Sequence, residues 1–73
     1  MATKETMELT GGQRVVQKRR SMELTQDEVG ELSGIDRAHI SRIEAGATIG
    51  RKRAQKLAAA FGEADNWRLY VSE

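Results

Sequence analysis

A break between two short helical patterns, at Ser33-Gly34, limits most strongly what this 73-residue chain can fold into. The surrounding stretch, LSGIDRAHISRIEAG, has apolar residues at helical spacing on both sides of the glycine. Gly34 can take the left-handed backbone conformation that ends a helix, and Asp36 can cap a new helix directly afterwards. The pattern therefore predicts two small helices joined by a tight turn, the second at about 37–45 and ending at Gly46.

The helix before the break has an equally clear start. Thr25-Gln26-Asp27-Glu28 is a capping box: Thr25 caps the helix, Glu28 reaches back to the cap, and Leu24 is the apolar residue before it. Val29 and Leu32 are expected to face inward. Two helices that meet at a steep angle need a small residue where they approach and a turn residue between them. Gly30 and Gly34 fill these places, and the apolar contacts come from Val29, Ile35, Ile40 and Ile43.

Three further helices are predicted in the rest of the chain. The first lies at about 12–22, after the break Thr10-Gly11-Gly12, with its inner side formed by Val15, Arg19 and Met22. The fourth lies at about 51–61, after a loop at 47–50, and its i, i+3, i+4, i+7 apolar set is Ala54, Leu57, Ala58 and Phe61. A last short helix at 65–72, capped by Asp65 or Asn66, carries Trp67, Leu69, Tyr70 and Val71.

These elements predict an all-α fold, a compact five-helix bundle that contains a helix-turn-helix at 25–45. Residues 1–9 are expected to form a flexible arm and residues 10–73 a single domain, as the length prior suggests. With no cysteine and one histidine, a metal site built by the protein is not expected, and no cofactor is predicted. The chain lacks a signal-like apolar segment near its start and a membrane-length apolar run, so a cytoplasmic protein is expected.

Basic residues are unevenly distributed although the formal net charge is only +1. Ten of the 12 lie in three blocks, at 14–20, 37–42 and 51–56, whereas the acidic residues lie mostly elsewhere. Such clustering is typical of one basic face on a polar body. Enzyme chemistry has little support, because no carboxylate pair or Ser-His-Asp set falls in a recognisable catalytic pattern.

The helix at 37–45 separates its side chains into two faces. On a wheel of about 100° per residue, Ile40 and Ile43 point inward. The opposite face carries Arg37, Ala38, Ser41 and Arg42. Arginine can bond both O6 and N7 of guanine, serine can donate or accept, and alanine can contact a thymine methyl group. These four residues are therefore the candidates for base contact in a DNA major groove.

The stretch TQDEVGELSGIDRAHISRIEAG resembles the helix-turn-helix of the lambda-type phage repressor and Cro family, also called the XRE family. The likeness extends over about residues 13–70: VVQKRRSMELTQ is similar to the family's first helix and LAAAFGEADNWRL to its last two. The chain departs from the family in two places. The loop before the fourth helix lacks the usual proline, and Gly30 stands where alanine is more usual. Glycine at this position lowers helix stability by up to ~1 kcal/mol relative to alanine.

The resemblance implies roles for particular residues. Gln26 is similar to a family glutamine that bonds phosphate, and Arg19 and Glu44 match an ion pair that ties the first helix to the end of the third. Residues beyond the third helix match positions that touch the DNA backbone: Thr48, Arg51, Lys52 and Arg53. Arg14 or Lys18 is expected to add a further phosphate contact. Tyr70 and Val71 are the expected subunit contact of a homodimer, and Trp67 is expected in the core.

The resulting interpretation is a sequence-specific regulator of transcription, a repressor in preference to an activator. It binds double-stranded DNA as a dimer on a partly palindromic operator and reads the major groove with the helix at 37–45. Two alternatives keep the same DNA-binding body: the antitoxin of a toxin–antitoxin pair and a controller of restriction–modification genes. Protein partners in these settings would be a toxin or RNA polymerase. A third alternative, from another class, is an adaptor that uses this fold to bind protein and tolerates exchange of Arg37 and Arg42.

Overall fold

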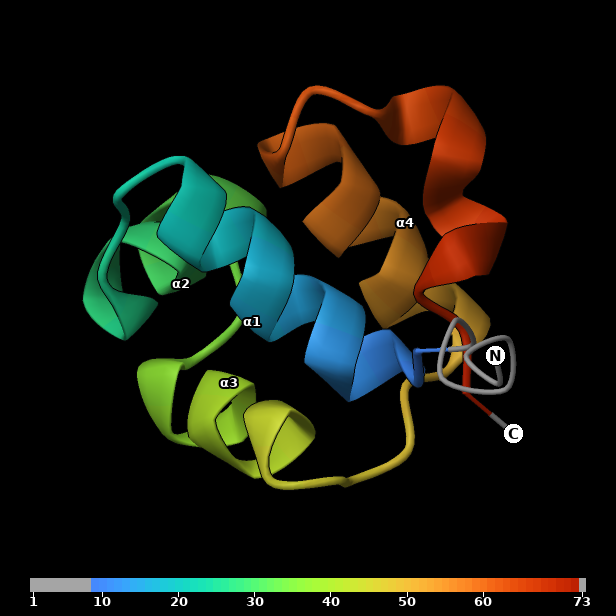
Figure 1. Cartoon of the computed structure of the whole chain (residues 1–73), viewed down its shortest axis with the longest axis horizontal. Coiled ribbons are helices and arrows are strands. Elements are labelled where there is room, and N and C mark those ends of the chain that lie inside the picture. Colours follow the sequence, from blue (N-terminus) through green and yellow to red (C-terminus); the bar gives the residue numbers. More distant parts are fainter. Residues whose placement is uncertain (1–8, 73) are drawn as a thin grey trace, which may run out of the picture.

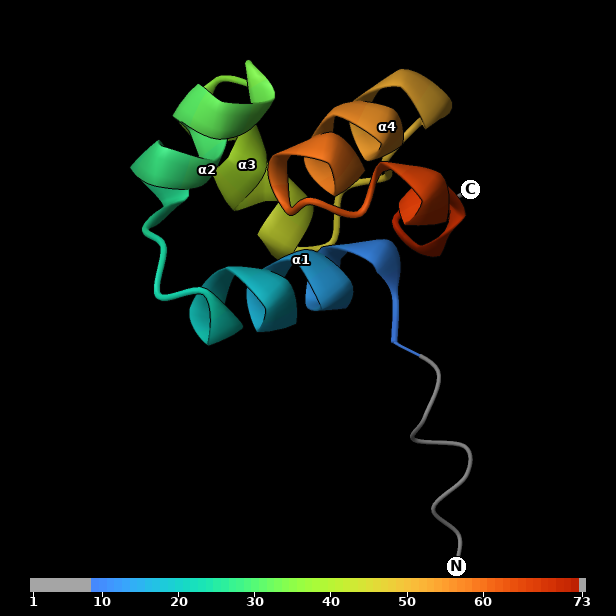
Figure 2. The same cartoon turned by 90° about the horizontal axis from the view of Figure 1, so that it is seen from above.

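The computed structural model describes residues 9–72, which form four α-helices and one 3₁₀ helix. The bounds are Gly11–Ser21 for α1, Gln26–Ser33 for α2, Arg37–Glu44 for α3, Arg51–Ala60 for α4 and Ala64–Leu69 for the 3₁₀ helix η2. In the view of Figure 1, α1 runs diagonally across the molecule, with α2 and α3 to one side of it and α4 and η2 to the other. Figure 2 shows α1 on one side of the fold and α2, α3 and α4 on the other. The all-α, five-helix prediction is confirmed.

The core forms where the inner faces of the helices meet. Its residues are Val15, Val29, Ile35, Ile40, Ile43, Ile49, Ala54, Leu57, Ala58, Phe61 and Tyr70, each at most 6% exposed. The predicted apolar sets of α3 and α4 are all among them. Burying such side chains is the main favourable term in folding. Within residues 9–72, no helix has the length and apolar character that crossing a bilayer requires.

The turn between α2 and α3 follows the sequence pattern closely. Thr25 and Glu28 form the expected capping box, and the Asp36 carboxylate accepts from the Ala38 amide at 3.2 Å. Gly34 has φ 76°, in the left-handed region. A Cβ on Gly30 would lie 2.8 Å from the backbone oxygen of Ile35. Glycine at position 30 therefore permits the close approach of the two helices.

Two inward side chains were predicted wrongly. Met22 and Leu32 are 41% and 57% exposed. Met22 follows the last turn of α1 as its C-cap, and the inner face of α2 passes through Val29 and Ser33 rather than Leu32. The buried Ser33 hydroxyl has hydrogen-bond partners nearby: it donates to the Val29 backbone oxygen at 2.7 Å and accepts from the Ile35 amide at 3.2 Å.

The glycines before the first helix were predicted to be a break, but they belong to α1. Thr10 caps the helix in a second capping box with Gln13, so α1 begins at Gly11. A Cβ on Gly12 would lie 2.2 Å from the backbone oxygen of Ile43, and one on Gly11 would lie 2.2 Å from that of Tyr70. The absence of side chains at these positions lets α1 pack directly on the backbone of α3 and of the C-terminal segment.

The C-terminal segment differs most from the prediction. η2 starts at Ala64, one residue before the expected helix, and Glu63 is its N-cap without a side-chain hydrogen bond, so neither Asp65 nor Asn66 caps it. The loop at 47–50 contains buried Ile49, which forms an isolated antiparallel bridge with Ser72. The Ser72 amide donates to the Ile49 oxygen at 3.0 Å, and the Ile49 amide donates to the Ser72 hydroxyl at 2.7 Å.

Candidate nucleic-acid interface

The outer face of α3 is the centre of the candidate interface. Ile40 and Ile43 are fully buried and fix the rotation of the helix. Because side chains on the opposite side then point to solvent, Ala38, Ser41 and Arg42 are exposed. Arg42 forms no ion pair within residues 9–72. Its guanidinium is thus available to a ligand that lies along the helix.

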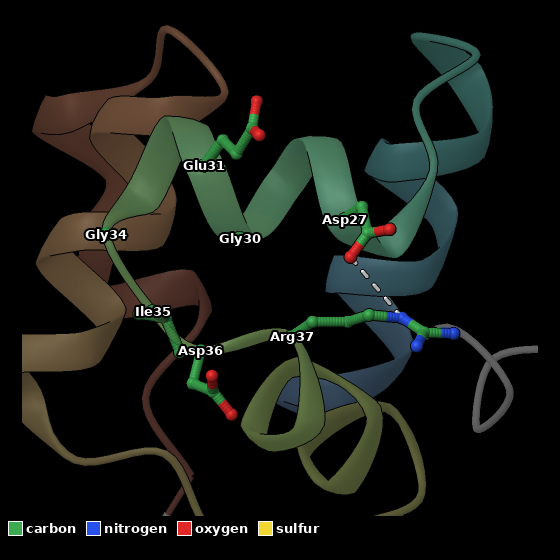
Figure 3. Close-up of a pocket in the computed structure, with 7 residues that line it drawn as sticks. All are labelled: Asp27, Gly30, Glu31, Gly34, Ile35, Asp36 and Arg37. Atoms are coloured by element: carbon green, nitrogen blue, oxygen red, sulfur yellow. Dashed lines mark ion pairs between the residues drawn. The ribbon is translucent and has the colours of Figure 1, made fainter.

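Arg37 lies at the edge of this face, next to α2. Its side chain is 66% exposed, and its Nε lies 3.5 Å from Oδ1 of Asp27, whose side chain is 73% exposed. Figure 3 shows the arginine extended across the corner between the two helices toward the aspartate. The hollow at this corner is lined by Asp27, Gly30, Glu31, Gly34, Ile35, Asp36 and Arg37. Arg37 is therefore a surface residue with one ionic partner.

A partly buried hydrogen-bond network holds α3 against α1 and α2. Arg19 on α1 donates from Nε to Oε2 of Glu44 at 2.7 Å and from Nη2 to Oε1 at 3.0 Å. A further nitrogen of Arg19 donates to the Leu24 backbone oxygen at 3.0 Å. Gln26 donates from Nε2 to Oε1 of Glu44, also at 3.0 Å. The structure thus brings together Arg19 and Glu44 and adds Gln26 as a third member.

The charges of this network are mutually stabilised. The Arg19 and Glu44 side chains are only 16% and 9% exposed. Burial alone would raise the pKa of Glu44, but hydrogen bonds from Arg19 and Gln26 and the charges of Arg19 and Arg20 outweigh it and lower the pKa. The hydrogen bond to Glu44 raises the pKa of Arg19 in turn. The orientation of α3 therefore depends on a fully ionised pair.

Gln26 occupies the first position of α2 and is half-buried. The sequence resemblance implies that its amide bonds a phosphate. In the structure one amide hydrogen is directed to Glu44, so the network fixes the glutamine in place at the end of α2. The side-chain amide has two donor hydrogens. The second one therefore remains for a phosphate of the DNA backbone.

A second basic group follows the loop after α3. Arg51, Lys52 and Arg53 form the exposed first turn of α4, and Thr48 is exposed in the preceding loop. Gly50 caps α4 without a side-chain hydrogen bond. None of these three basic residues forms an ion pair in the part of the chain that the structure describes. They remain accessible cations beside the loop that connects α3 to α4.

Arg14 and Lys18 lie on another face of α1. Lys18 Nζ is 2.8 Å from Oε2 of Glu63, and the Tyr70 hydroxyl donates to Oε1 of the same carboxylate at 2.7 Å. The hydrogen bonds from Lys18 and then Tyr70 lower the pKa of Glu63. Arg14 lines a hollow together with Lys18, Glu63 and Tyr70. The structure thus groups these two residues with the C-terminal segment and not with Gln26 and α3.

In the C-terminal segment Tyr70, expected at a subunit contact, lies in the core, and Trp67, expected in the core, packs against it from a half-buried position. Tyr70 is 2% exposed and packs on Phe61, with ring centroids 5.8 Å apart, whereas Trp67 is half-buried. Burial, and then the hydrogen bond to Glu63, raise the pKa of Tyr70. A side chain so enclosed does not fit the predicted dimer contact. Val71, the other predicted contact, is half-buried.

Sequence patterns missed two accessible features of this surface. Arg68 lies outside the three basic blocks, yet it shares a hollow with Arg51, Trp67 and Val71, and its guanidinium stacks 4.6 Å from the Trp67 ring centroid. Asp27 was noted only as part of a capping segment. The nearness of Arg68 to Arg51 and of Asp27 to Arg37 has no local sequence signal, because each depends on how two separate elements pack together.

Comparison with known proteins supports one family. A helix-turn-helix family model of the XRE/Cro/C1 type matches residues 15–67, most of the chain, from α1 into η2. Neither the curated proteins nor the solved structures contain a significant match. The matched range includes α2, α3 and the Arg19–Glu44 pair, together with the first turn of α4.

Proposed function

Because this chain belongs to the XRE/Cro/C1-type helix-turn-helix family, a family of DNA-binding regulatory domains, we propose that it regulates transcription by binding a specific operator. The observation that carries the proposal is the orientation of α3: Ile40 and Ile43 lie in the core, and Ala38, Ser41 and Arg42 face solvent. A helix held in this way enters a major groove with its polar face toward the base edges. Arg37 and Arg42 read bases, most simply guanines, and Ala38 and Ser41 complete the contact.

Phosphate contacts set the register of the protein on the duplex. Gln26 supplies one side of the recognition helix, and Thr48 and the first turn of α4 supply the other through Arg51, Lys52 and Arg53. Arg68, beside Arg51, extends this second group. Arg14 and Lys18 are left out of the phosphate set because they line the hollow that contains Glu63. Such contacts position a protein without reading sequence, and they weaken with salt because neutralised phosphates release counterions.

The regulator acts as a homodimer on a partly palindromic operator, as a repressor that occludes polymerase, and it works in the cytoplasm with its DNA. Leu69, 45% exposed, and half-buried Trp67 and Val71 are apolar side chains of the C-terminal segment that remain accessible to a second copy. A two-fold dimer places its recognition helices one turn of DNA apart, about 34 Å.

Selection of bound duplexes from a random pool tests the proposal, with protein–DNA stoichiometry measured on the winning sequence. We expect one preferred, partly palindromic sequence that binds two copies of the chain and outcompetes bulk DNA by at least about a thousandfold. A pool from which no sequence emerges contradicts operator binding. The chain then fits a protein-binding adaptor. If the preferred duplex binds one copy of the chain, only the proposed dimer is contradicted, and operator binding stands.

A further inference from the structure

We propose that Asp27 is a specificity-determining residue that holds Arg37 in the orientation in which it reads a base and, through its charge, weakens attachment to DNA of any sequence. The inference rests on the proposed function, because it assigns a second residue to the base contact of Arg37. It follows from the position of one carboxylate on α2 and one guanidinium on α3.

The contact between these residues leaves the reading end of the arginine free. Oδ1 of Asp27 is 3.5 Å from Nε of Arg37 (Figure 3). The two terminal Nη atoms have no hydrogen-bond or ion-pair partner within residues 9–72. Two parallel N–H groups from those atoms can bond O6 and N7 of one guanine. Asp27 therefore engages the side of the guanidinium and leaves its end for the base.

Tethering matters because arginine is long and flexible. An unrestrained side chain loses rotamer freedom when it binds, and this loss reduces the affinity gained from the contact. An arginine held by a carboxylate has already lost part of its rotamer freedom before it binds DNA, so binding costs less. The tether also limits the alternative in which Arg37 swings to a phosphate when the base is not guanine. Both effects increase the difference between correct and incorrect base pairs.

The charge of Asp27 acts on all sequences alike. Its carboxylate is 73% exposed at the N-terminal end of α2, next to the helix that enters the groove. A negative charge there repels the DNA backbone and lowers non-specific affinity. Loss of this charge should therefore strengthen binding to random DNA, while loss of the tether reduces discrimination at one base pair. The first effect is measured as affinity for random DNA and the second as discrimination at a single base pair, so the two are separable.

Glu31 provides a matched control on the same helix. It lines the same hollow and is exposed. In the part of the chain that the structure describes, it makes neither an ion pair nor a side-chain hydrogen bond, and it does not contact Arg37. Asp36, the third carboxylate of the hollow, is unsuitable because it caps α3. Glu31→Gln thus removes one charge from this surface without removing a tether.

The test uses the selected operator and a duplex changed at the base pair that Arg37 reads. That base pair is the one at which Arg37→Ala loses discrimination. Dissociation constants for both duplexes and for random DNA are measured with wild type, Asp27→Asn, Glu31→Gln, Arg37→Ala and the double variant Asp27→Asn/Arg37→Ala, at one salt concentration. Circular dichroism melting checks that every variant is folded.

We expect Asp27→Asn and Glu31→Gln to strengthen binding to random DNA by a similar factor, roughly two- to fivefold. Only Asp27→Asn should lower discrimination at the Arg37 base pair, by about three- to tenfold. In the Arg37→Ala background, Asp27→Asn should leave discrimination at that position unchanged, because the residue through which it acts is gone.

Three results overturn the inference and leave the proposed function intact: unchanged discrimination in Asp27→Asn, an equal loss in Glu31→Gln, or a loss that persists without Arg37. A wild type with no preferred duplex overturns the proposed function, and the inference fails with it. The behaviour of the wild type therefore distinguishes the two failures before any variant is measured.

Discussion

Arg19 and Glu44 form a two-point hydrogen-bonded ion pair, 2.7 and 3.0 Å long, between α1 and the last residue of α3. The two positions are 25 residues apart in sequence. Gln26 donates to the same carboxylate at the start of α2. Three helices are therefore oriented by one carboxylate at the end of the helix that we propose reads the bases.

Removing one partner of the Arg19–Glu44 pair should destabilise the fold more than removing both. We expect Arg19→Met or Glu44→Leu alone to lower the free energy of unfolding by about 3 kcal/mol, because each leaves a largely buried charge without its partner. The double variant should lose less than either single variant, because no buried charge is left without a partner. Urea denaturation measures all three variants. Simple additivity would show that the two charges are already well solvated separately.

The acid side of the stability profile should depend on Glu44. Its pKa is below the ordinary value of 4.5 in the folded protein, so the unfolded chain binds protons first as the pH falls. The stabilisation is thus present above the unfolded pKa and is lost as the pH falls through the folded one, below about pH 5. Glu44→Gln should be less stable than wild type at pH 7 and lose less stability upon acidification. Glu31→Gln, which removes an exposed carboxylate, is the comparison. Parallel curves of stability against pH for wild type and Glu44→Gln would exclude a role of Glu44 in the acid dependence.

A methyl group at position 12 should destabilise the protein although alanine is the better helix former. Replacing glycine inside a helix normally gains about 1 kcal/mol. In Gly12→Ala the new Cβ meets the Ile43 backbone oxygen at 2.2 Å, and α1 must move away from α3. We expect a net loss of roughly 1–3 kcal/mol. Gly50→Ser, at a cap position where no atom lies within 4 Å, should be neutral or slightly stabilising.

Arg42→Ala should lower affinity for the selected operator by ~1–3 kcal/mol and relax the preference at one base pair. Arg42 is exposed and makes no ion pair within residues 9–72, so thermal stability should hardly change. Binding titrations with the operator and with single-base variants measure the effect. An equal loss on random DNA would mean that Arg42 contacts the backbone.

Lys52→Gln should weaken binding to all sequences alike and reduce the salt slope by about one. Lys18→Gln is the matched control, because Lys18 lies on the face of α1 that packs near the C-terminal segment and its ammonium is paired with Glu63. Its salt slope should stay close to that of wild type. Titrations at several salt concentrations decide, and a larger change for Lys18 than for Lys52 would reverse the assignment of the phosphate surface.

The helix-turn-helix could be predicted because its signals are local. The capping box at Thr25, the left-handed Gly34 and the spacing of Ile40 and Ile43 each depend on residues within one or two helical turns. The same holds for the outward face of α3, which follows from helical periodicity once its inner side is known. Leu32 was placed wrongly because the periodicity of apolar residues does not count serine as an inward residue. Ser33 is nevertheless buried, since its hydroxyl forms hydrogen bonds with Val29 and Ile35.

The features that escaped prediction join residues far apart in the chain. Gly12 is adjacent to Ile43, Ile49 is bridged to Ser72, and Tyr70 rather than Trp67 completes the core. A glycine pair reads as a break unless the opposing backbone is known. An aromatic residue near the end of a small chain can equally well be core or surface when only its type is considered.

The contacts of residues 70–72 also determine when this fold can close during synthesis. Tyr70 fills the core and its backbone lies against Gly11, while Ser72 satisfies the amide of Ile49. A nascent chain whose residues 70–72 are still inside the ribosomal tunnel lacks the aromatic ring that packs on Phe61 and the bridge that holds Ile49. The apolar core is therefore complete only after residues 70–72 have left the ribosome.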